Sequence, residues 1–386
     1  MCSLEEKMNP RVLELQLSGI RRFFNMVAGT EGMISLTIGQ PDFPTPLHVK
    51  DAGKRAIDEN FTSYTHNAGM VELRKAASDF MKEKYRLDYD EDEVIITSGA
   101  SQGIDVTLKS ILVEGDECIL PGPVYPGYEP IIKLSGAKPI HIDTTSNGFK
   151  LDASLLKTAI TSKTKCIILP YPSNPTGVSL TAEELEEIAE LVRGRGIFVV
   201  ADEIYSELTF DRSHRSIAEF LRDQTIVING LSKSHSMTGW RIGMVMAPKA
   251  ISQHLLKVHQ YNVSCATSVS QKAALAALTK GKDDAIPMKD AYRKRREYVY
   301  ERLVGMGFRN VIKPDGAFYY FVEIPERFNG DSFAFCLELV QKEKVAVVPG
   351  EAFSVMGEGY FRLSYACSME ELEEGLDRME NFLASF

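Results

Sequence analysis

The sequence has few cysteines and no long apolar run. Its 386 residues include six cysteines, which are scattered without a C-x-x-C pair or any spacing typical of metal sites. No apolar run approaches the ~20 residues that span a bilayer, and residues 1–10 are polar, without the apolar core of a signal peptide. We therefore expect unpaired thiols, no metal site and a cytoplasmic location.

An excess of basic charge is also absent. The chain has 53 Asp and Glu residues against 44 Lys and Arg residues, which gives a formal net charge of −9, whereas nucleic-acid-binding domains usually carry a basic excess. Hydrophobic residues make up 44% and charged residues 25% of the chain, as in soluble globular enzymes. The length favours two domains, with small molecules rather than nucleic acid as partners.

Short apolar runs alternate with helical patterns between residues 92 and 250. Seven of the runs have strand length, and several are nearly continuous in Val and Ile, as strands buried on both faces are. They cover residues 93–97, 117–120, 139–143, 166–169, 197–201, 225–229 and 242–247. Between two runs, Thr181 and Glu184 form a capping box that starts a helix. The alternation predicts a mainly parallel α/β sheet flanked by helices.

The two ends of the sequence have a different pattern. Residues 1–46 form a short arm with a loop at 39–44, and a charged helix is expected at 292–303, strands at 317–322 and 360–364, and a final helix from Ser368. We expect a small domain assembled from both termini. The expected boundaries are 1–46 for the arm and part of the small domain, 47–284 for the large domain, and 285–386 for the C-terminal small domain.

Polar residues follow four of the predicted strands, where ligands of open α/β sheets bind. Residues 98–102 open a helix with small side chains, whose free N–H groups suit a phosphate. Three prolines fix a rigid loop around Asn174. Each feature alone is equally typical of an ordinary helix cap or turn.

The other two strand ends carry charged side chains. Asp202 follows the run at 197–201, where an acid is usually paired. Lys233 follows the run at 225–229 in a stretch with little other charge, where desolvation lowers the pKa of an amine and makes it a nucleophile. A phosphate cradle, an amide, a carboxylate and an amine are together the groups that pyridoxal 5′-phosphate (PLP) needs.

The most specific motif is Ser232-Lys233 followed by residues 237–243, with Arg241 eight residues after the lysine. With this motif and the loops before it, the sequence resembles the class I/II aminotransferases, PLP-dependent enzymes of fold type I, over essentially its whole length. The resemblance implies an α/β fold, with a large domain around a mainly parallel seven-stranded sheet and a small α+β domain. It also implies transamination between an amino acid and a 2-oxo acid.

The resemblance further implies a role for each site residue. Lys233 would bind the cofactor covalently and move the substrate proton, and Asp202 would pair with the pyridine nitrogen. Tyr205 and Asn174 would bind the ring's 3-oxygen, and Tyr125 would stack on the ring. The phosphate would be bound by Ala100, Ser101 and Arg241, and by Tyr64 of a neighbouring subunit. Arg362, Gly39 and Asn174 would bind the substrate. A homodimer with shared active sites follows from the role of Tyr64.

One position departs from the family pattern. Many members carry a serine three residues before the lysine as a phosphate contact, and here that position is Gly230. Ser232 is the candidate replacement.

Within the family, residues 18–21, 36–43 and 229–237 are most similar to the N-acetyl-L,L-diaminopimelate aminotransferases of bacterial lysine biosynthesis. This similarity implies 2-oxoglutarate as the amino acceptor, with aspartate or aromatic amino acid aminotransferase as the alternative. Arg21 and Arg22 could face a distal carboxylate or be surface charges.

Three other classes of protein fit the sequence less well than an aminotransferase. A PLP-dependent C–S β-lyase or decarboxylase could share the lysine, acid and arginine, but a lyase would release pyruvate and ammonia. A PLP-binding transcription regulator needs a DNA-binding domain, and only about 40 residues precede the large domain in this acidic chain. A nicotinamide-dependent dehydrogenase is disfavoured because no G-x-G-x-x-G follows a predicted strand.

Overall fold

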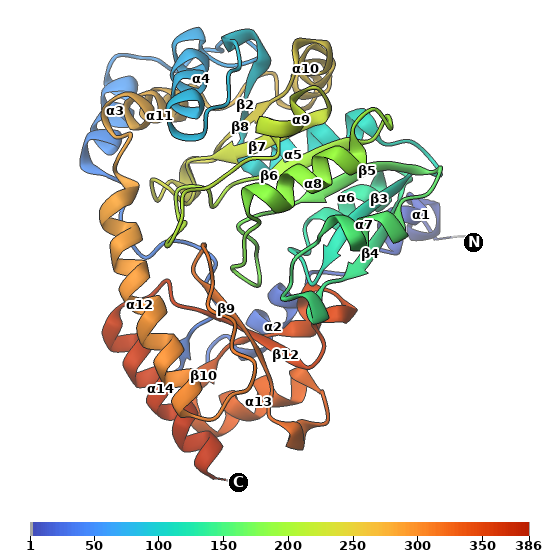
Figure 1. Ribbon diagram of the computed structural model, residues 1–386. Coiled ribbons are helices and arrows are strands. Elements are labelled where there is room, and N and C mark those ends of the chain that lie inside the picture. Colours follow the sequence, from blue (N-terminus) through green and yellow to red (C-terminus); the bar gives the residue numbers. More distant parts are fainter. Residues whose placement is uncertain (1–2, 386) are drawn as a thin grey trace.

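A computed structural model describes residues 3–385 and has two packed parts with a site between them (Figure 1). The upper part in Figure 1 is built on a seven-stranded sheet. Its strands are β2 (Val94–Ser98), β3 (Glu117–Gly122), β4 (Lys138–Asp143), β5 (Thr164–Leu169), β6 (Phe198–Asp202), β7 (Thr225–Gly230) and β8 (Ile242–Met246). All seven predicted strands are present.

The order of the strands is β2-β8-β7-β6-β5-β3-β4. Strand β8 runs antiparallel to both neighbours, and the other pairs are parallel. The prediction of a mainly parallel sheet is therefore confirmed. Because β8 alone is reversed, the carboxyl ends of β2, β5, β6 and β7 share one edge of the sheet, and the residues that follow them can meet.

Helices cover both faces of this sheet (Figure 1). They are α3 (Leu47–Asp58), α4 (Val71–Tyr85), α5 (Gly99–Ile111), α6 (Tyr128–Leu134), α7 (Ala153–Ala159), α8 (Ala182–Val192), α9 (Ala218–Leu221), α10 (Lys249–Val263) and α11 (Ser268–Lys280). Helix α8 begins with the predicted capping box of Thr181 and Glu184.

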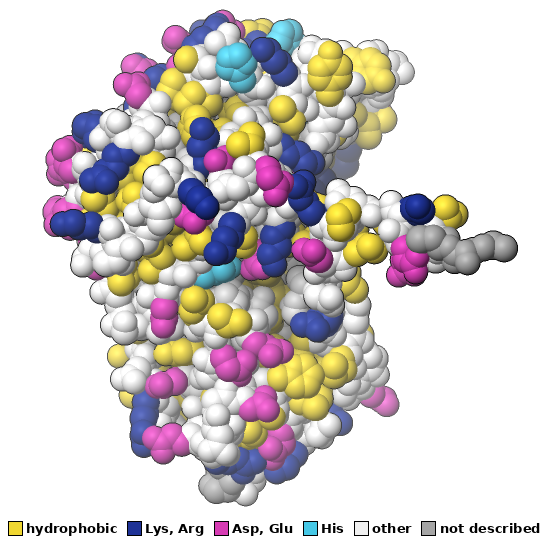
Figure 2. Space-filling model, turned by 90° about the vertical axis from the view of Figure 1, so that its right-hand side faces the viewer, with side chains coloured by type: hydrophobic (Ala, Val, Ile, Leu, Met, Phe, Trp, Pro, Cys, Tyr) yellow, Lys and Arg dark blue, Asp and Glu magenta, His cyan; other side chains and the backbone are white. Residues whose placement is uncertain are grey.

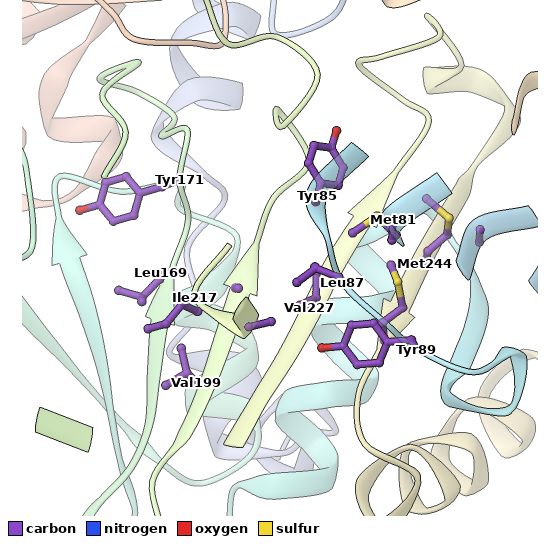
Figure 3. Close-up of a cluster of buried hydrophobic side chains, with 14 of the residues drawn as sticks. Met81, Tyr85, Leu87, Tyr89, Leu169, Tyr171, Val199, Ile217, Val227 and Met244 are labelled. Carbon is purple, nitrogen blue, oxygen red and sulfur yellow. The ribbon is translucent and has the colours of Figure 1, made fainter. Parts of the chain in front are cut away.

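Alternate side chains of one strand enter separate cores, because successive residues of a strand point to opposite faces. In β7, Val227 joins one core, and Ile226 and Ile228 join the other. Figure 3 shows Val227 in the first core, near Met81 and Leu87. Burial on both faces explains why this strand is a continuous apolar run in the sequence.

The lower part is assembled from both ends of the chain. Strand β1 (Ile34–Ser35) pairs with β10 (Val345–Ala346), and β11 (Val348–Pro349), β12 (Tyr360–Ser364) and β9 (Tyr319–Glu323) form a second sheet in the order β11-β12-β9. Its helices are α2 (Gly19–Val27) from the N-terminal side, and α12 (Ala285–Gly305), α13 (Ser332–Glu343) and α14 (Met369–Ala384) from the C-terminal side, whereas the short α1 (Pro10–Leu13) lies beside α6 of the upper part (Figure 1). Helix α12 runs from the upper into the lower part (Figure 1).

Two predicted boundaries in this part were wrong. Helix α12 begins at Ala285 rather than at residue 292, with Pro287 in its first turn, where a missing N–H leaves no helical hydrogen bond unmade. Strand β9 begins at Tyr319 rather than at residue 317, because Ala317 has a φ of 58°, which a strand cannot contain. Within residues 3–385, no helix has the length and apolarity required to cross a membrane.

Candidate active site

A cavity of about 290 Å³ lies at the shared strand edge, between the two parts of the molecule. Eleven of the twelve predicted site residues line it. They are Gly39, Ala100, Ser101, Tyr125, Asn174, Asp202, Tyr205, Ser232, Lys233, Arg241 and Arg362. Residues that are far apart in the chain therefore meet in one space, as the strand order requires.

Lys233 lies in the turn that follows β7, and its side chain is half-buried in the cavity wall. Its Nζ donates a hydrogen bond of 2.6 Å to the carbonyl oxygen of Gly39. Burial lowers the pKa of Lys233 to about 8, the positive charges of Arg362 and Arg241 lower it as well, and Asp202 opposes them. A larger fraction of this amine is neutral near pH 7 than of an ordinary lysine, so it is a better nucleophile and base.

Asp202 is the last residue of β6, and it is buried. Its Oδ2 accepts a hydrogen bond of 2.7 Å from the hydroxyl of Tyr128, and its Oδ1 accepts one of 3.3 Å from the backbone N–H of Ile204. Burial raises the pKa of Asp202 to about 6, while these two hydrogen bonds act in the opposite direction. The carboxylate is thus held in a fixed direction and available to a cation in the cavity.

The first turn of α5 and the side chain of Arg241 form a narrow cradle. Gly99 has a φ of 77°, and a Cβ at this position would lie 2.3 Å from Nη2 of Arg241. Gly243 on β8 packs as closely, because its Cβ would lie 2.5 Å from the backbone nitrogen of Ala100. Only glycines let the guanidinium and the helix N-terminus approach each other here, and together they form a site for an anion.

The sheet explains the glycine at position 230. Gly230 is paired with Gly243 on β8, and a Cβ at position 230 would lie 2.8 Å from the carbonyl oxygen of Ile242. A serine there would clash with the backbone. Ser232 instead lines the cavity beside Lys233.

Arg362, on β12, is the cation contributed by the lower part. Its Nη1 donates to Oδ1 of Asn174 at 2.8 Å, and its Nη2 donates to the carbonyl oxygen of Thr37 at 2.7 Å. The guanidinium lies 4.4 Å from the ring centre of Tyr319 and 4.9 Å from that of Phe353. Its buried Nε has no hydrogen-bond partner within residues 3–385, so a donor remains for a carboxylate ligand.

Nine residues that line the cavity were not predicted from the sequence: Ile20, Thr37, Ile104, Tyr128, Pro170, Pro172, Ile204, Thr238 and Tyr319. Tyr319 belongs to a predicted strand, and its hydroxyl lies 2.8 Å from that of Tyr205. Tyr128 begins α6, and nothing in its neighbourhood distinguishes it from a core tyrosine. Their roles depend on contacts between distant segments, which motif spacing does not indicate.

Tyr64 is the one predicted site residue that is outside the cavity. It lies in the loop between α3 and α4, and 87% of its surface is exposed. Arg21 and Arg22 on α2 are also exposed, although Ile20 of the same helix lines the cavity.

The cavity combines groups with distinct chemical capacities. The amine of Lys233 can attack a carbonyl and move a proton, and Arg362 can bind a carboxylate. The cradle at Arg241 can hold an anion, and Asp202 can hold a protonated nitrogen. This combination suits a phosphate-bearing carbonyl cofactor and a substrate with a carboxylate.

Comparison with known proteins gives the family. Residues 31–379 match the model of the family described as aminotransferase class I and II. The chain is 62% identical, over 98% of its length and 96% of the relative's, to a probable N-acetyl-LL-diaminopimelate aminotransferase of Bacillus subtilis (strain 168). It is 40% identical to an aspartate aminotransferase of Pyrococcus abyssi, over 97% and 98% of the two chains.

Solved structures share the fold over nearly the whole chain. An aspartate aminotransferase of Thermotoga maritima has a TM-score of 0.92 and 35% identity, with 98% and 100% of the two chains covered. An aromatic aminotransferase of Pyrococcus horikoshii has a TM-score of 0.89 and 38% identity, with 95% and 99% covered. The expected fold type I is confirmed, and the chain belongs to the class I and II aminotransferases.

Proposed function

We propose that this aminotransferase uses PLP, bound in the cavity and attached to Lys233. The observation that carries the proposal is the convergence of the Lys233 amine, the Asp202 carboxylate and the Arg241 cradle on one cavity. The cradle fits a phosphate because a Cβ at Gly99 would fill it. When bound, PLP supplies the electron sink that lets a substrate lose its α-proton.

The residues of the large sheet would hold and polarise the ring. Asp202 would keep the pyridine nitrogen protonated, and Tyr125 would lie on the ring face. Tyr205 and Asn174 would bind the 3-oxygen, and Ala100, Ser101, Ser232 and Arg241 would bind the phosphate. Fixed groups of this kind stabilise charge without reorganising during the reaction.

Lys233 and Arg362 would act on the substrate. Arg362 would bind the α-carboxylate through its free Nε and the edge of its fork, with Gly39 and Asn174 alongside. The amine of Lys233, with a pKa of about 8, would take the proton from the α-carbon and return it at the neighbouring position.

We infer that the substrates are N-acetyl-L,L-diaminopimelate and 2-oxoglutarate, in lysine biosynthesis. The support is the identity of 62% to the Bacillus subtilis relative of that name. Aspartate or aromatic amino acids are the alternative, since relatives with those names are about as long and 40% identical.

We also infer a homodimer in which Tyr64 binds the phosphate of the partner's site. Its exposure supports this, as does a group of exposed apolar side chains on the N-terminal arm, which projects from the body in Figure 2. That group comprises Leu4, Met8, Val12, Leu13 and Leu17. Large exposed apolar groups commonly mark interfaces.

The expected domains and location remain proposals as well. The boundary at 46/47 is supported by the start of α3 at Leu47, and the boundary at 284/285 by the start of α12 at Ala285. A cytoplasmic location is supported by the free thiols of Cys118, Cys166, Cys265, Cys336 and Cys367.

The test uses the purified protein and borohydride. Reduction should fix the cofactor on the peptide that contains Lys233, as read by mass spectrometry. Lys233→Ala should lose that label and transaminate several orders of magnitude more slowly, whereas Lys249→Ala, a surface lysine, should behave as wild type. Label on a different lysine would refute the assignment, and release of pyruvate and ammonia from an amino acid alone would indicate a lyase.

A further inference from the structure

One short segment contacts both cations that act on the substrate. The carbonyl oxygen of Thr37 accepts from Nη2 of Arg362 at 2.7 Å, and the carbonyl oxygen of Gly39 accepts from Nζ of Lys233 at 2.6 Å. The two cations come from different parts of the molecule, β12 and the turn after β7. The backbone of residues 37–39 therefore connects them directly.

The segment is anchored to α12 by an ion pair. Arg295 donates from Nη1 to Oδ1 of Asp42 and from Nη2 to Oδ2, both at 2.9 Å. The hydroxyl of Tyr292, one turn earlier on α12, donates to the same Oδ1 at 3.0 Å. The ring of Phe43 lies 5.3 Å from the guanidinium of Arg295. A bidentate, partly buried pair of this kind fixes direction as well as distance.

The far end of the segment is anchored to the lysine turn. The hydroxyl of Thr45 donates to the carbonyl oxygen of Ser236 at 2.7 Å and accepts from the indole nitrogen of Trp240 at 3.1 Å. Residues 37–45 are thus held at α12 on one side and three residues after Lys233 on the other.

We propose that residues 37–45 act as a spacer that sets the separation of the Lys233 amine and the Arg362 guanidinium, and that Arg295 is the positioning residue that holds this spacer through Asp42. An α-amino acid carries its carboxylate and the proton to be removed on one carbon, so the Lys233 amine that takes the proton and the Arg362 guanidinium that binds the carboxylate must be held at a matching separation. This inference rests on the roles proposed above for Lys233 and Arg362.

The chain contains a matched control for Arg295. Arg296, the next residue of α12, is also buried and also bidentate, with hydrogen bonds of 2.7 and 3.0 Å to the two oxygens of Asp211. Asp211 lies outside the spacer and does not line the cavity. Loss of either bidentate pair removes one anchor of a buried arginine on α12, but only loss of the first releases the spacer.

The experiment compares Arg295→Lys with Arg296→Lys in the holoenzyme. An ammonium cannot bind both carboxylate oxygens in the geometry of a guanidinium. For Arg295→Lys we expect the KM of the amino donor to rise about tenfold, with kcat changed less than about threefold. We also expect the pH midpoint of the cofactor's visible absorption to rise by about half a unit, because Arg362 no longer depresses the basicity of Lys233 as strongly.

Arg296→Lys should keep the wild-type KM and midpoint, with a loss of thermal stability similar to that of Arg295→Lys. Asp42→Asn and Thr45→Val release the spacer at its two anchors and should reproduce the shifts of Arg295→Lys. Equal KM values and midpoints for the two arginine variants would overturn the proposal, as would failure of all three spacer variants to fold. The proposed function fails separately, if borohydride does not label Lys233 in the wild type.

Discussion

The hydroxyl of Tyr128 donates a hydrogen bond of 2.7 Å to Oδ2 of Asp202 in the wall of the cavity. Tyr128 begins α6 and Asp202 ends β6, so this bond joins a helix and a strand that are far apart in the sequence. It lowers the pKa of Asp202 while burial raises that pKa to about 6. Tyr128 therefore helps to decide the pH at which the carboxylate becomes ionised.

Removal of this bond should shift the pH dependence of cofactor binding. Tyr128→Phe removes a hydrogen bond that lowers the pKa of Asp202, so this pKa should rise. The pH below which the affinity for the cofactor falls should therefore move up by about one unit. Cofactor titrations of the cofactor-free protein across this pH range measure the shift. Tyr125→Phe is the control, because Tyr125 makes no hydrogen bond to Asp202 in the described chain. Coincident curves for Tyr128→Phe and wild type would contradict the prediction.

Neutralising Asp202 should stabilise the cofactor-free protein. The folded-state pKa of Asp202, about 6, lies above the 3.8 of an unperturbed aspartate, so ionisation of Asp202 opposes folding, and the stability present below pH 3.8 is lost as the pH rises through about 6. Asp202→Asn should therefore be more stable than wild type at pH 8, by about 1–3 kcal/mol, with no gain near pH 4. Urea unfolding of both proteins at pH 8 and at pH 4 measures this difference in the free energy of unfolding. A less stable variant at pH 8 would show that the carboxylate is paired rather than strained.

Replacing the guanidinium of Arg362 should impair every α-amino acid substrate. Its two Nη atoms donate to Asn174 and Thr37, and its Nε has no partner among the described residues. A lysine amine cannot make these two hydrogen bonds and also bind a carboxylate in the same geometry. We expect kcat/KM of Arg362→Lys to fall about 10²–10³-fold for amino acids. Steady-state kinetics with a panel of donors measures the loss. Amines without an α-carboxylate serve as the internal control, since a fall of the same size for them would place Arg362 outside the carboxylate site.

A mixing experiment should show whether the active sites are shared. Lys233→Ala lacks the amine, and Tyr64→Asp would, if the site is shared, place a negative charge beside the partner's phosphate. In a mixed dimer with a shared site, one site carries both defects and the other is whole, so activity should return to no more than about one good site in two. Activity is measured after co-refolding, with heterodimers verified by mass. If Tyr64 serves its own chain, the mixture stays as inactive as its parents.

The sheet could be predicted because its strands leave a strong local signal. A strand such as β7 is buried at every position, so its sequence is an unbroken apolar run. The residues directly after such strands were then placed together by the rule that ligands bind at carboxyl ends. This reasoning found Lys233, Asp202 and Asn174 without a structure.

The rest of the site depends on contacts that have no local signature. Thr37 binds Arg362 through its backbone carbonyl oxygen, which any residue type would supply. Tyr319 is oriented by a hydroxyl contact with Tyr205 from the other part of the molecule. The bond from Tyr128 to Asp202 likewise joins segments whose separation only the packed fold determines.

The pairing of β1 with β10 has a consequence for how the enzyme is made. Ile34 pairs with Val345, and the carbonyl oxygen of Thr37 accepts a hydrogen bond from Arg362. The early segment therefore leaves the ribosome long before its partners have been synthesised. At 5–20 residues per second, the interval is about 15–60 s. The large sheet can fold during that time, while the apolar side chains near β1 stay uncovered and open to chaperones. Arg362 takes its place in the cavity wall only after β12, the last strand, has been synthesised.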